Sequence, residues 1–399
     1  MAWTHACFAA MMAPANITLV GITCRRPDAC FHFRCSMKDD STIDFSKAAT
    51  AAQGIAPMSE PNVTYHDIFA PNYTVTGIRQ DGGTERPVVI TGSYESSPGA
   101  APQALLYRGP LYPTDSSGYA FLKPSIGGRT ATSSVLYGPN TPLFDPGIGA
   151  GNVRAVGSYK FAAGGKLDHG MMYEGPWDGL GTWTPIDVPD HLVSGAVANT
   201  IAHSTMGDLV VGNYDIAGKP GSGNGFIYNI KTKAYTLLNI GELATAYGIW
   251  QNGDSTSSSY TIAGGYKSGN GLNVGFLVNY DSSTGRFSGL SDFNYDNNPG
   301  IVTHFEGITG VPGGYTLAAT GDNGAAFAAI ASNGNGRFGV PKWVPIDYSA
   351  STGICTANSI LDNNLIGIYQ PAAGGIQSYL ATVSDLAVSG LSMTEQVGA

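Results

Sequence analysis

Asp208-Leu-Val-Val-Gly-Asn-Tyr214 is a short apolar segment that ends in a Gly-x-Tyr step. The step also occurs at Gly92-Ser93-Tyr94, Gly157-Ser158-Tyr159, Gly264-Gly265-Tyr266 and Gly367-Ile368-Tyr369, and a degenerate copy stands at Ala319-Thr320-Gly321. Self-similarity at a period of about 40 to 60 residues is typical of repeat architectures, and strand-like units at this period indicate a β-propeller. The Gly-x-Tyr step therefore predicts the fold.

Each repeat unit contains four segments with strand character, bounded by Gly, Asn, Asp and Ser. The first carries a small residue and Ile or Val, as in Thr76-Gly77-Ile78, Ser133-Ser134-Val135, Asn199-Thr200-Ile201, Tyr247-Gly248-Ile249, Glu306-Gly307-Ile308 and Asn358-Ser359-Ile360. The second ends in Gly-x-Tyr. The third is a compact apolar run such as Gly225-Phe-Ile-Tyr228, and the fourth resembles Trp183-Thr-Pro-Ile-Asp187. Small first-strand residues are expected where strands converge on the propeller axis.

The last unit lacks a fourth strand after Thr382-Val383, and the chain has a spare one at its start, Val63-Thr-Tyr-His-Asp-Ile68. Pairing of this strand with the last unit would remove two open sheet edges. We therefore predict an all-β fold, a six-bladed β-propeller over residues 60–385 closed by an N-terminal strand. Residues 1–59 are predicted to be a leader and flexible linker, and residues 386–399 a C-terminal tail.

The composition excludes several classes of partner. The net charge of −9 and the absence of a basic cluster argue against nucleic acid. No apolar run approaches the ~18 residues of a transmembrane helix, so we expect no stable membrane insertion. Cys24, Cys30 and Cys35 lie before the repeats without a standard zinc spacing, so we predict no metal and no cofactor. The oligomeric state stays open.

The first residues contain a short apolar stretch, Ala6-Cys-Phe-Ala-Ala-Met-Met-Ala13, of signal-peptide size. Two N-glycosylation sequons follow, Asn62-Val-Thr64 and Asn72-Tyr-Thr74. Together they favour a secretory or extracellular location, with Asn62 and Asn72 as glycosylation sites.

The candidate catalytic residues are His304 and Glu306, because they break the repeat. They stand where other units carry Thr74 and Thr76, Thr245 and Tyr247, or Thr356 and Asn358. Two residues apart on one strand, they point to the same face and can act as proton donor and acceptor. The alternative is a hydrogen-bonded pair that only stabilises a polar channel.

Further substrate-binding candidates surround this position. Strand two ends at the Gly-x-Tyr step, so the tyrosines should lie near the face at which strand one begins, either as an aromatic collar or as packing between blades. The predicted set comprises His169, Arg129, Tyr94, Tyr159, Tyr214, Tyr247 and Asn358. By contrast, His203 and Trp250 follow the first-strand Ile in the alignment above and are expected nearer the opposite face.

The strands Gly225-Phe-Ile-Tyr228 and Gly275-Phe-Leu-Val278, with the Thr184-Pro-Ile-Asp187 step, resemble bacterial extracellular repeat propellers. In its length, leader, sequons before the first blade, and Gly-Ser-Tyr and Tyr-Glu-Gly-Pro-Trp177 segments, the chain also resembles fungal hetero-Diels–Alderases of tropolone sesquiterpenoid pathways. This resemblance implies a cofactor-free pericyclase. Its substrates would be a tropolone-derived quinone methide and a humulene-type sesquiterpene.

Two other functional classes remain open at this point. The first is a secreted, non-catalytic propeller that binds a glycan or a protein. The second is a hydrolase or isomerase that uses His304 and Glu306 as an acid–base pair. No Gly-x-Ser-x-Gly elbow, His-Glu-x-x-His motif or phosphate-binding glycine loop occurs in the sequence, which argues against the chemistries that those motifs carry.

Overall fold

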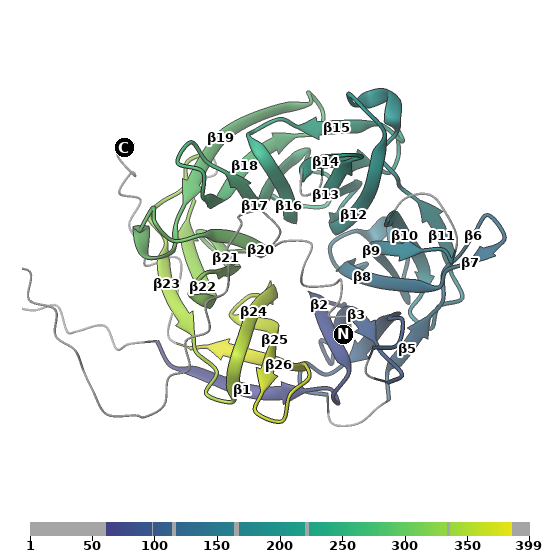
Figure 1. Cartoon of the computed structure of the whole chain (residues 1–399), viewed down its shortest axis with the longest axis horizontal. Coiled ribbons are helices and arrows are strands. Elements are labelled where there is room, and N and C mark those ends of the chain that lie inside the picture. Colours follow the sequence, from purple (N-terminus) through teal and green to yellow (C-terminus); the bar gives the residue numbers. More distant parts are fainter. Residues whose placement is uncertain are drawn as a thin grey trace, which may run out of the picture.

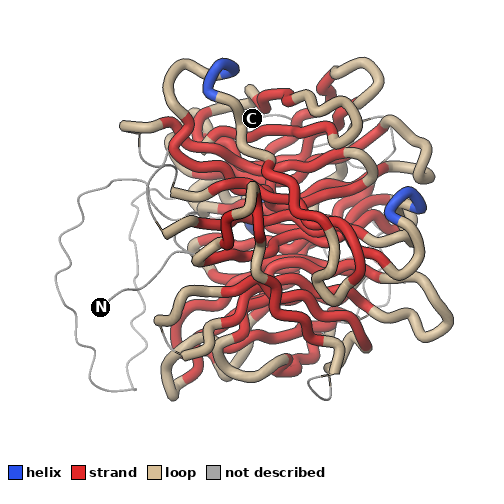
Figure 2. Tube along the Cα trace, turned by 90° about the vertical axis from the view of Figure 1, so that its right-hand side faces the viewer, coloured by secondary structure: helices blue, strands red, loops and turns tan. Residues whose placement is uncertain are grey.

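The computed structural model describes residues 61–384, except residues 98, 114–116, 163–166, 220–222 and 333–335. The predicted leader and linker, with Cys7, Cys24, Cys30 and Cys35, and the predicted tail lie outside these described residues. Nearly all of the described chain consists of strands and the turns that join them, with short helical segments only in connecting loops (Figure 2).

Six four-stranded antiparallel sheets surround a central axis, which confirms the six-bladed β-propeller (Figure 1). Blade 1 contains β2 (Tyr73–Gln80), β3 (Val88–Tyr94), β4 (Gln103–Gly109) and β5 (Tyr119–Leu122). Blade 2 contains β8 (Ser133–Asn140), β9 (Asn152–Lys160), β10 (His169–Pro176) and β11 (Thr182–Pro185). Blade 3 contains β12 (Val197–Met206), β13 (Leu209–Ile216), β14 (Asn224–Asn229) and β15 (Tyr235–Leu238).

The remaining blades continue around the axis. Blade 4 contains β16 (Glu242–Gln251), β17 (Ser259–Lys267), β18 (Asn273–Asp281) and β19 (Arg286–Phe293). Blade 5 contains β20 (Thr303–Val311), β21 (Gly314–Gly321), β22 (Gly324–Ala331) and β23 (Lys342–Ile346). Blade 6 contains β24 (Ser351–Leu361), β25 (Asn364–Pro371) and β26 (Gln377–Val383). The connections include the hairpin β6 (Ser125–Ile126) with β7 (Arg129–Thr130) and the 3₁₀ turns η3 (Pro146–Ile148), η4 (Asp190–Leu192) and η5 (Tyr295–Asn297).

The outer strand of blade 6 comes from the other end of the chain. Strand β1 (Val63–Ile68) pairs antiparallel with β26, with Val63 opposite Val383 and Ile68 opposite Ser378. Figure 1 shows β1 beside β24–β26. The first and last strands of the ring therefore belong to one sheet.

The core lies between blades rather than at the axis. Each of six buried clusters takes side chains from two neighbouring blades, for example Tyr173 with Leu106 and Phe305 with Phe293. Full burial of such a side chain contributes about 1.5–3 kcal/mol. These clusters hold the six sheets in a ring.

The glycine of the Gly-x-Tyr step has a steric cause. A Cβ built on Gly92 would lie 1.9 Å from the carbonyl oxygen of Thr74 on the innermost strand. The glycines of blades 2, 3, 4 and 6 meet the equivalent carbonyl at 1.9 to 2.1 Å. Strand two approaches strand one too closely at this point for any side chain.

Candidate functional site in the central channel

The six innermost strands each contain a β-bulge at an equivalent position. The bulged residues are Thr76, Tyr137, His203, Tyr247, Glu306 and Asn358, and we call them the bulge ring. Each is half-buried, whereas the preceding residue is buried in all six strands. A bulge re-aims the residue that it inserts. All six strands lie next to the propeller axis (Figure 1), so the bulge ring surrounds the axis, and we use the term channel for the region that it encloses.

A small residue follows each bulge because neighbouring blades touch there. A Cβ on Gly77 would lie 1.8 Å from the carbonyl oxygen of Tyr137, and one on Gly138 would lie 2.5 Å from that of His203. The complete set is Gly77, Gly138, Ser204, Gly248, Gly307 and Ser359. The small-residue expectation therefore holds at this position.

In blades 2 and 3 the predicted position of the small first-strand residue is wrong, because it lies four residues before the position that the structure shows. Sequence analysis placed Ser133-Ser134-Val135 and Asn199-Thr200-Ile201 here, whereas the structure places Tyr137-Gly138 and His203-Ser204. The Ile or Val that marks the position elsewhere is Pro139 in blade 2 and Thr205 in blade 3, which removed the signal. Consequently, the expectation that His203 lies nearer the opposite face is also wrong, because it is level with Glu306.

The two sides of the channel differ. Four rings on consecutive blades contact one another in series: Tyr137 with His203 at 5.1 Å, His203 with Tyr247 at 4.8 Å, and Tyr247 with His304 at 5.8 Å between centroids. We call these four residues the aromatic arc. On the other side, Thr76 donates to the Leu136 carbonyl at 2.5 Å and Asn358 donates to the Val75 carbonyl at 2.7 Å.

His304 and Glu306 form a pair at one end of the aromatic arc. The distance from His304 Nε2 to Glu306 Oε1 is 3.0 Å, and the two side chains are 7% and 18% exposed. The two residues therefore form a pair on one strand, and the Glu306 side chain is partly exposed. An imidazole bonded to a carboxylate can deliver a proton and take one back.

His203 is the principal site residue that sequence analysis missed. Its Nε2 lies 2.7 Å from Asn213 Oδ1, and burial lowers the pKa of His203, which favours the neutral imidazole. With Nε2–H donated to Asn213, Nδ1 remains a hydrogen-bond acceptor. Burial, together with the charge of Glu306, raises the pKa of Tyr247, so its hydroxyl stays protonated. The channel thus holds an acceptor and a donor next to the His304–Glu306 pair.

His169 and Arg129 belong to a separate cluster in and beside blade 2. His169 Nδ1 lies 2.7 Å from Asp187 Oδ2, and the His169 ring stacks on Tyr159 at 5.0 Å. The Arg129 guanidinium lies 3.9 Å from the centroid of Phe161, which itself contacts the His169 ring. Burial and the nearby Asp187 raise the pKa of Tyr159 to about 12. The structure brings His169, Arg129 and Tyr159 together, but with one another rather than with the aromatic arc.

The Gly-x-Tyr tyrosines pack within the scaffold. Tyr159 and Tyr214 are buried in clusters between blades, and the Tyr266 hydroxyl donates to Asp292 at 2.7 Å. Tyr94 is half-buried and lies 4.8 Å from the rings of both Tyr73 and Phe121. This geometry matches the packing alternative for these residues, whereas Tyr247 and Asn358 do lie in the bulge ring.

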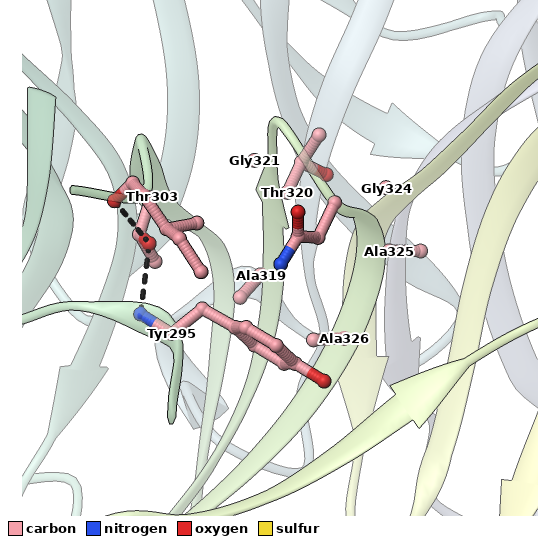
Figure 3. Close-up of a pocket in the computed structure, with 10 residues that line it drawn as sticks. Tyr295, Thr303, Ala319, Thr320, Gly321, Gly324, Ala325 and Ala326 are labelled. Carbon is pink, nitrogen blue, oxygen red and sulfur yellow. Dashed lines mark hydrogen bonds between the residues drawn. The ribbon is translucent and has the colours of Figure 1, made fainter. Parts of the chain in front are cut away.

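A shallow pocket lies beside β20, at the degenerate Gly-x-Tyr copy (Figure 3). Its empty volume is about 240 Å³ when the adjoining open solvent is included, and Tyr295 lines it opposite small residues such as Ala319 and Ala326. Thr320, which also lines the pocket, pairs with His304 in the sheet. The blade that lacks the tyrosine therefore has a recess behind the strand that carries His304 and Glu306.

Comparisons with known proteins give only distant structural similarity. The chain resembles an α-L-arabinofuranosidase from Fusarium graminearum at 12% identity, covering 82% of this chain and 98% of that one with a TM-score of 0.45. It resembles a subtype N11 neuraminidase-like protein of A/flat-faced bat/Peru/033/2010 at 10% identity, covering 82% of this chain and 92% of that one with a TM-score of 0.43.

A third similar structure is the extracellular domain of a putative one component system from B. thetaiotaomicron. The identity is 12% and the TM-score is 0.37, and the match covers 79% of this chain but only 39% of that one. No protein-family model matches the chain, and no curated protein matches it either. Function must therefore be argued from the residues themselves.

Two further features concern the residues that the structure describes. No helix in this part of the chain is long and apolar enough to span a membrane. No group of three or more His, Cys, Asp or Glu side chains is arranged there to hold a metal ion.

Proposed function

We propose that the chain is an enzyme whose active site is the channel end formed by the aromatic arc and Glu306. The observation that carries this proposal is the unequal distribution of residue types around the bulge ring. Its aromatic and ionisable members lie on blades 2 to 5, whereas Thr76 and Asn358 bond to backbone carbonyls. A scaffold role would repeat in every blade, but a single asymmetric ligand requires one distinct side.

The proposed reaction is a cofactor-free hetero-Diels–Alder cycloaddition, and the resemblance to the fungal hetero-Diels–Alderases suggests the substrates. A hydroxymethyl tropolone loses water to give a quinone methide, to which a humulene-type sesquiterpene alkene adds. In the first step a proton passes from the His304–Glu306 pair to the leaving hydroxyl, and the C–O bond breaks. The proton of the tropolone hydroxyl returns to the pair.

The other members of the aromatic arc have distinct roles in this proposal. The rings of His203 and Tyr247 provide a surface for the planar seven-membered ring. The Tyr247 hydroxyl, which is hydrogen-bonded with the Thr245 side chain, would donate its own proton to the developing ring oxygen, in the manner of an oxyanion-hole donor. Holding both substrates against these rings and away from water would orient the addition and protect the quinone methide from hydrolysis.

The test is His304→Ala and Glu306→Gln, assayed for cycloadduct formation above the spontaneous background. We expect each variant to fold and to lose about 10- to 1,000-fold in rate, by analogy with the removal of an oxyanion-hole donor. His66→Ala is the matched control, because His66 is exposed on β1, away from the channel. Wild-type rate and stereoselectivity in both channel variants, with folding verified by circular dichroism, would contradict the assignment.

A second candidate function, glycan binding without catalysis, is favoured by one surface feature. The Phe121 ring is 45% exposed and lies 4.8 Å from Tyr94 and 6.1 Å from Tyr73, so it offers an aromatic platform at the rim of blade 1. If this platform is the functional site, Phe121→Ala would abolish retention on a glycan array, and the channel variants would retain it.

A further inference from the structure

A buried arginine crosses the channel beyond the bulge ring. Arg79 follows Thr76 by three residues on β2 and is 4% exposed. Its Nη2 donates to the Ile249 carbonyl at 3.2 Å and its Nη1 to the Ile308 carbonyl at 3.3 Å. These carbonyls belong to blades 4 and 5, on the far side of the axis (Figure 1). The Arg79 side chain therefore spans the channel.

Among the residues that the structure describes, none provides a counter-ion for Arg79. Burial lowers the pKa of Arg79 to about 10, so the guanidinium is still protonated at neutral pH. In the part of the chain that the structure describes, no ion pair joins it to a carboxylate. Its Nε is buried without a hydrogen-bond partner. The Arg79 Cζ also lies 5.2 Å from the centroid of the Trp250 ring. A buried charge is costly unless it is paired, and two carbonyl dipoles and one aromatic face offset only part of that cost.

A second unpartnered donor lies at the same level on the neighbouring blade. Asn140 follows the bulged Tyr137 by three residues, as Arg79 follows Thr76, and it is fully buried. Its Oδ1 accepts from the Thr141 amide at 3.0 Å, which fixes the orientation of the side chain, and its Nδ2 has no partner. Thr141 donates to the Gln80 carbonyl at 2.7 Å, so β2 and β8 are adjacent at this level.

We propose that the channel end at Arg79 and Asn140 is a binding site for a small monovalent anion of the halide class. The free groups are both N–H donors and one side chain is cationic, which is the set that an anion requires. A water molecule can accept from both donors but leaves the positive charge unmatched. The site lies beyond the bulge ring from His304, so it closes the end of the channel opposite the proposed active site.

The first test locates the anion in the full chain. Crystals grown in sodium bromide should show an anomalous scattering peak between Arg79 Nε and Asn140 Nδ2. In solution, replacing gluconate by chloride at constant ionic strength should raise Tm, by about 2 °C for each tenfold excess of chloride over its dissociation constant. The absence of a bromide peak, with a water refined between the two donors, would overturn the proposal.

The second test replaces the bound anion with a negatively charged side chain of the protein. Asn140→Asp keeps the oxygen that accepts from Thr141 and replaces the free donor with a carboxylate that can pair with Arg79. This variant should lose both the bromide peak and the chloride dependence of Tm. Asn297→Asp, at an exposed position, is the matched control and should keep both. Equal chloride dependence in both variants would show that chloride acts on the protein generally, and would count against the site.

Discussion

At the residue scale, close contact between blades makes single glycines decisive. A Cβ on Gly77 would lie 1.8 Å from a backbone oxygen of the next blade, which cannot move without shifting β8. Gly77→Ala should therefore lower the free energy of unfolding by at least about 1–3 kcal/mol, the usual cost of overpacking. Gly82→Ala is the matched control, since nothing lies within 4 Å of its Cβ position. Urea unfolding of the two variants tests this, and equal midpoints would contradict the tight contact.

His203 gives a pH-dependent prediction at the same scale. Burial lowers its pKa below the ordinary value of 6.5, so the unfolded chain takes up a proton at higher pH than the folded chain. The contribution of neutral His203 to stability is complete above about pH 6.5 and is lost as the pH falls toward the folded pKa. His203→Gln, which does not titrate, should show a smaller fall in Tm between about pH 7 and pH 5 than wild type. The control is the exposed His66→Gln, which should show the same fall in Tm as wild type. If His203→Gln also shows the wild-type fall, burial of His203 does not contribute to the pH dependence.

At the scale of elements, the repeat predicts strands well and bulges poorly. The Gly-x-Tyr step marks the end of strand two reliably because its glycine is sterically required. The bulge is instead a feature of the backbone, and residues as different as Thr76 and Tyr247 stand at this position. Where the following Ile or Val was replaced by Pro139 or Thr205, sequence patterns gave the wrong register. The His304–Glu306 pair could be predicted, but Tyr137 and His203 could not be assigned to the same ring.

Strand β1 yields the prediction for this scale. It supplies the outer edge of blade 6, its Ile68 is buried, and its Asp67 accepts from the Tyr348 and Tyr369 hydroxyls at 2.9 Å. Deletion of residues 61–69 should abolish soluble expression, because β26 would become an open edge. His66→Ala, on the exposed side of the same strand, should leave the yield unchanged. Recovery of a soluble, monomeric propeller from the deletion, judged by size-exclusion chromatography, would show that the strand is dispensable.

At the scale of the whole molecule, fold and function follow from different parts of the sequence. Six repeated units impose a ring whatever its loops contain, so blade number could be predicted from spacing alone. The candidate site depends on four non-repeated rings contributed by blades 2 to 5, and their mutual contacts exist only when these blades pack against one another. Arg79 could be predicted least of all, because the two carbonyls that accept from its guanidinium lie 170 and 229 residues away in the sequence.

At the same scale, the leader and the two sequons lead us to expect that the chain enters a secretory route. Asn62 and Asn72 are both exposed, one before β1 and one in the turn between β1 and β2, so the fold leaves room for a glycan on each. In a fungal host we expect an N-glycan-removing enzyme to increase the electrophoretic mobility of the secreted protein. Asn62→Gln with Asn72→Gln should remove this change and leave the fold intact. If mass spectrometry finds both asparagines unmodified in the wild-type protein, the secretory assignment loses its main support, whereas the arguments for the channel site do not depend on it.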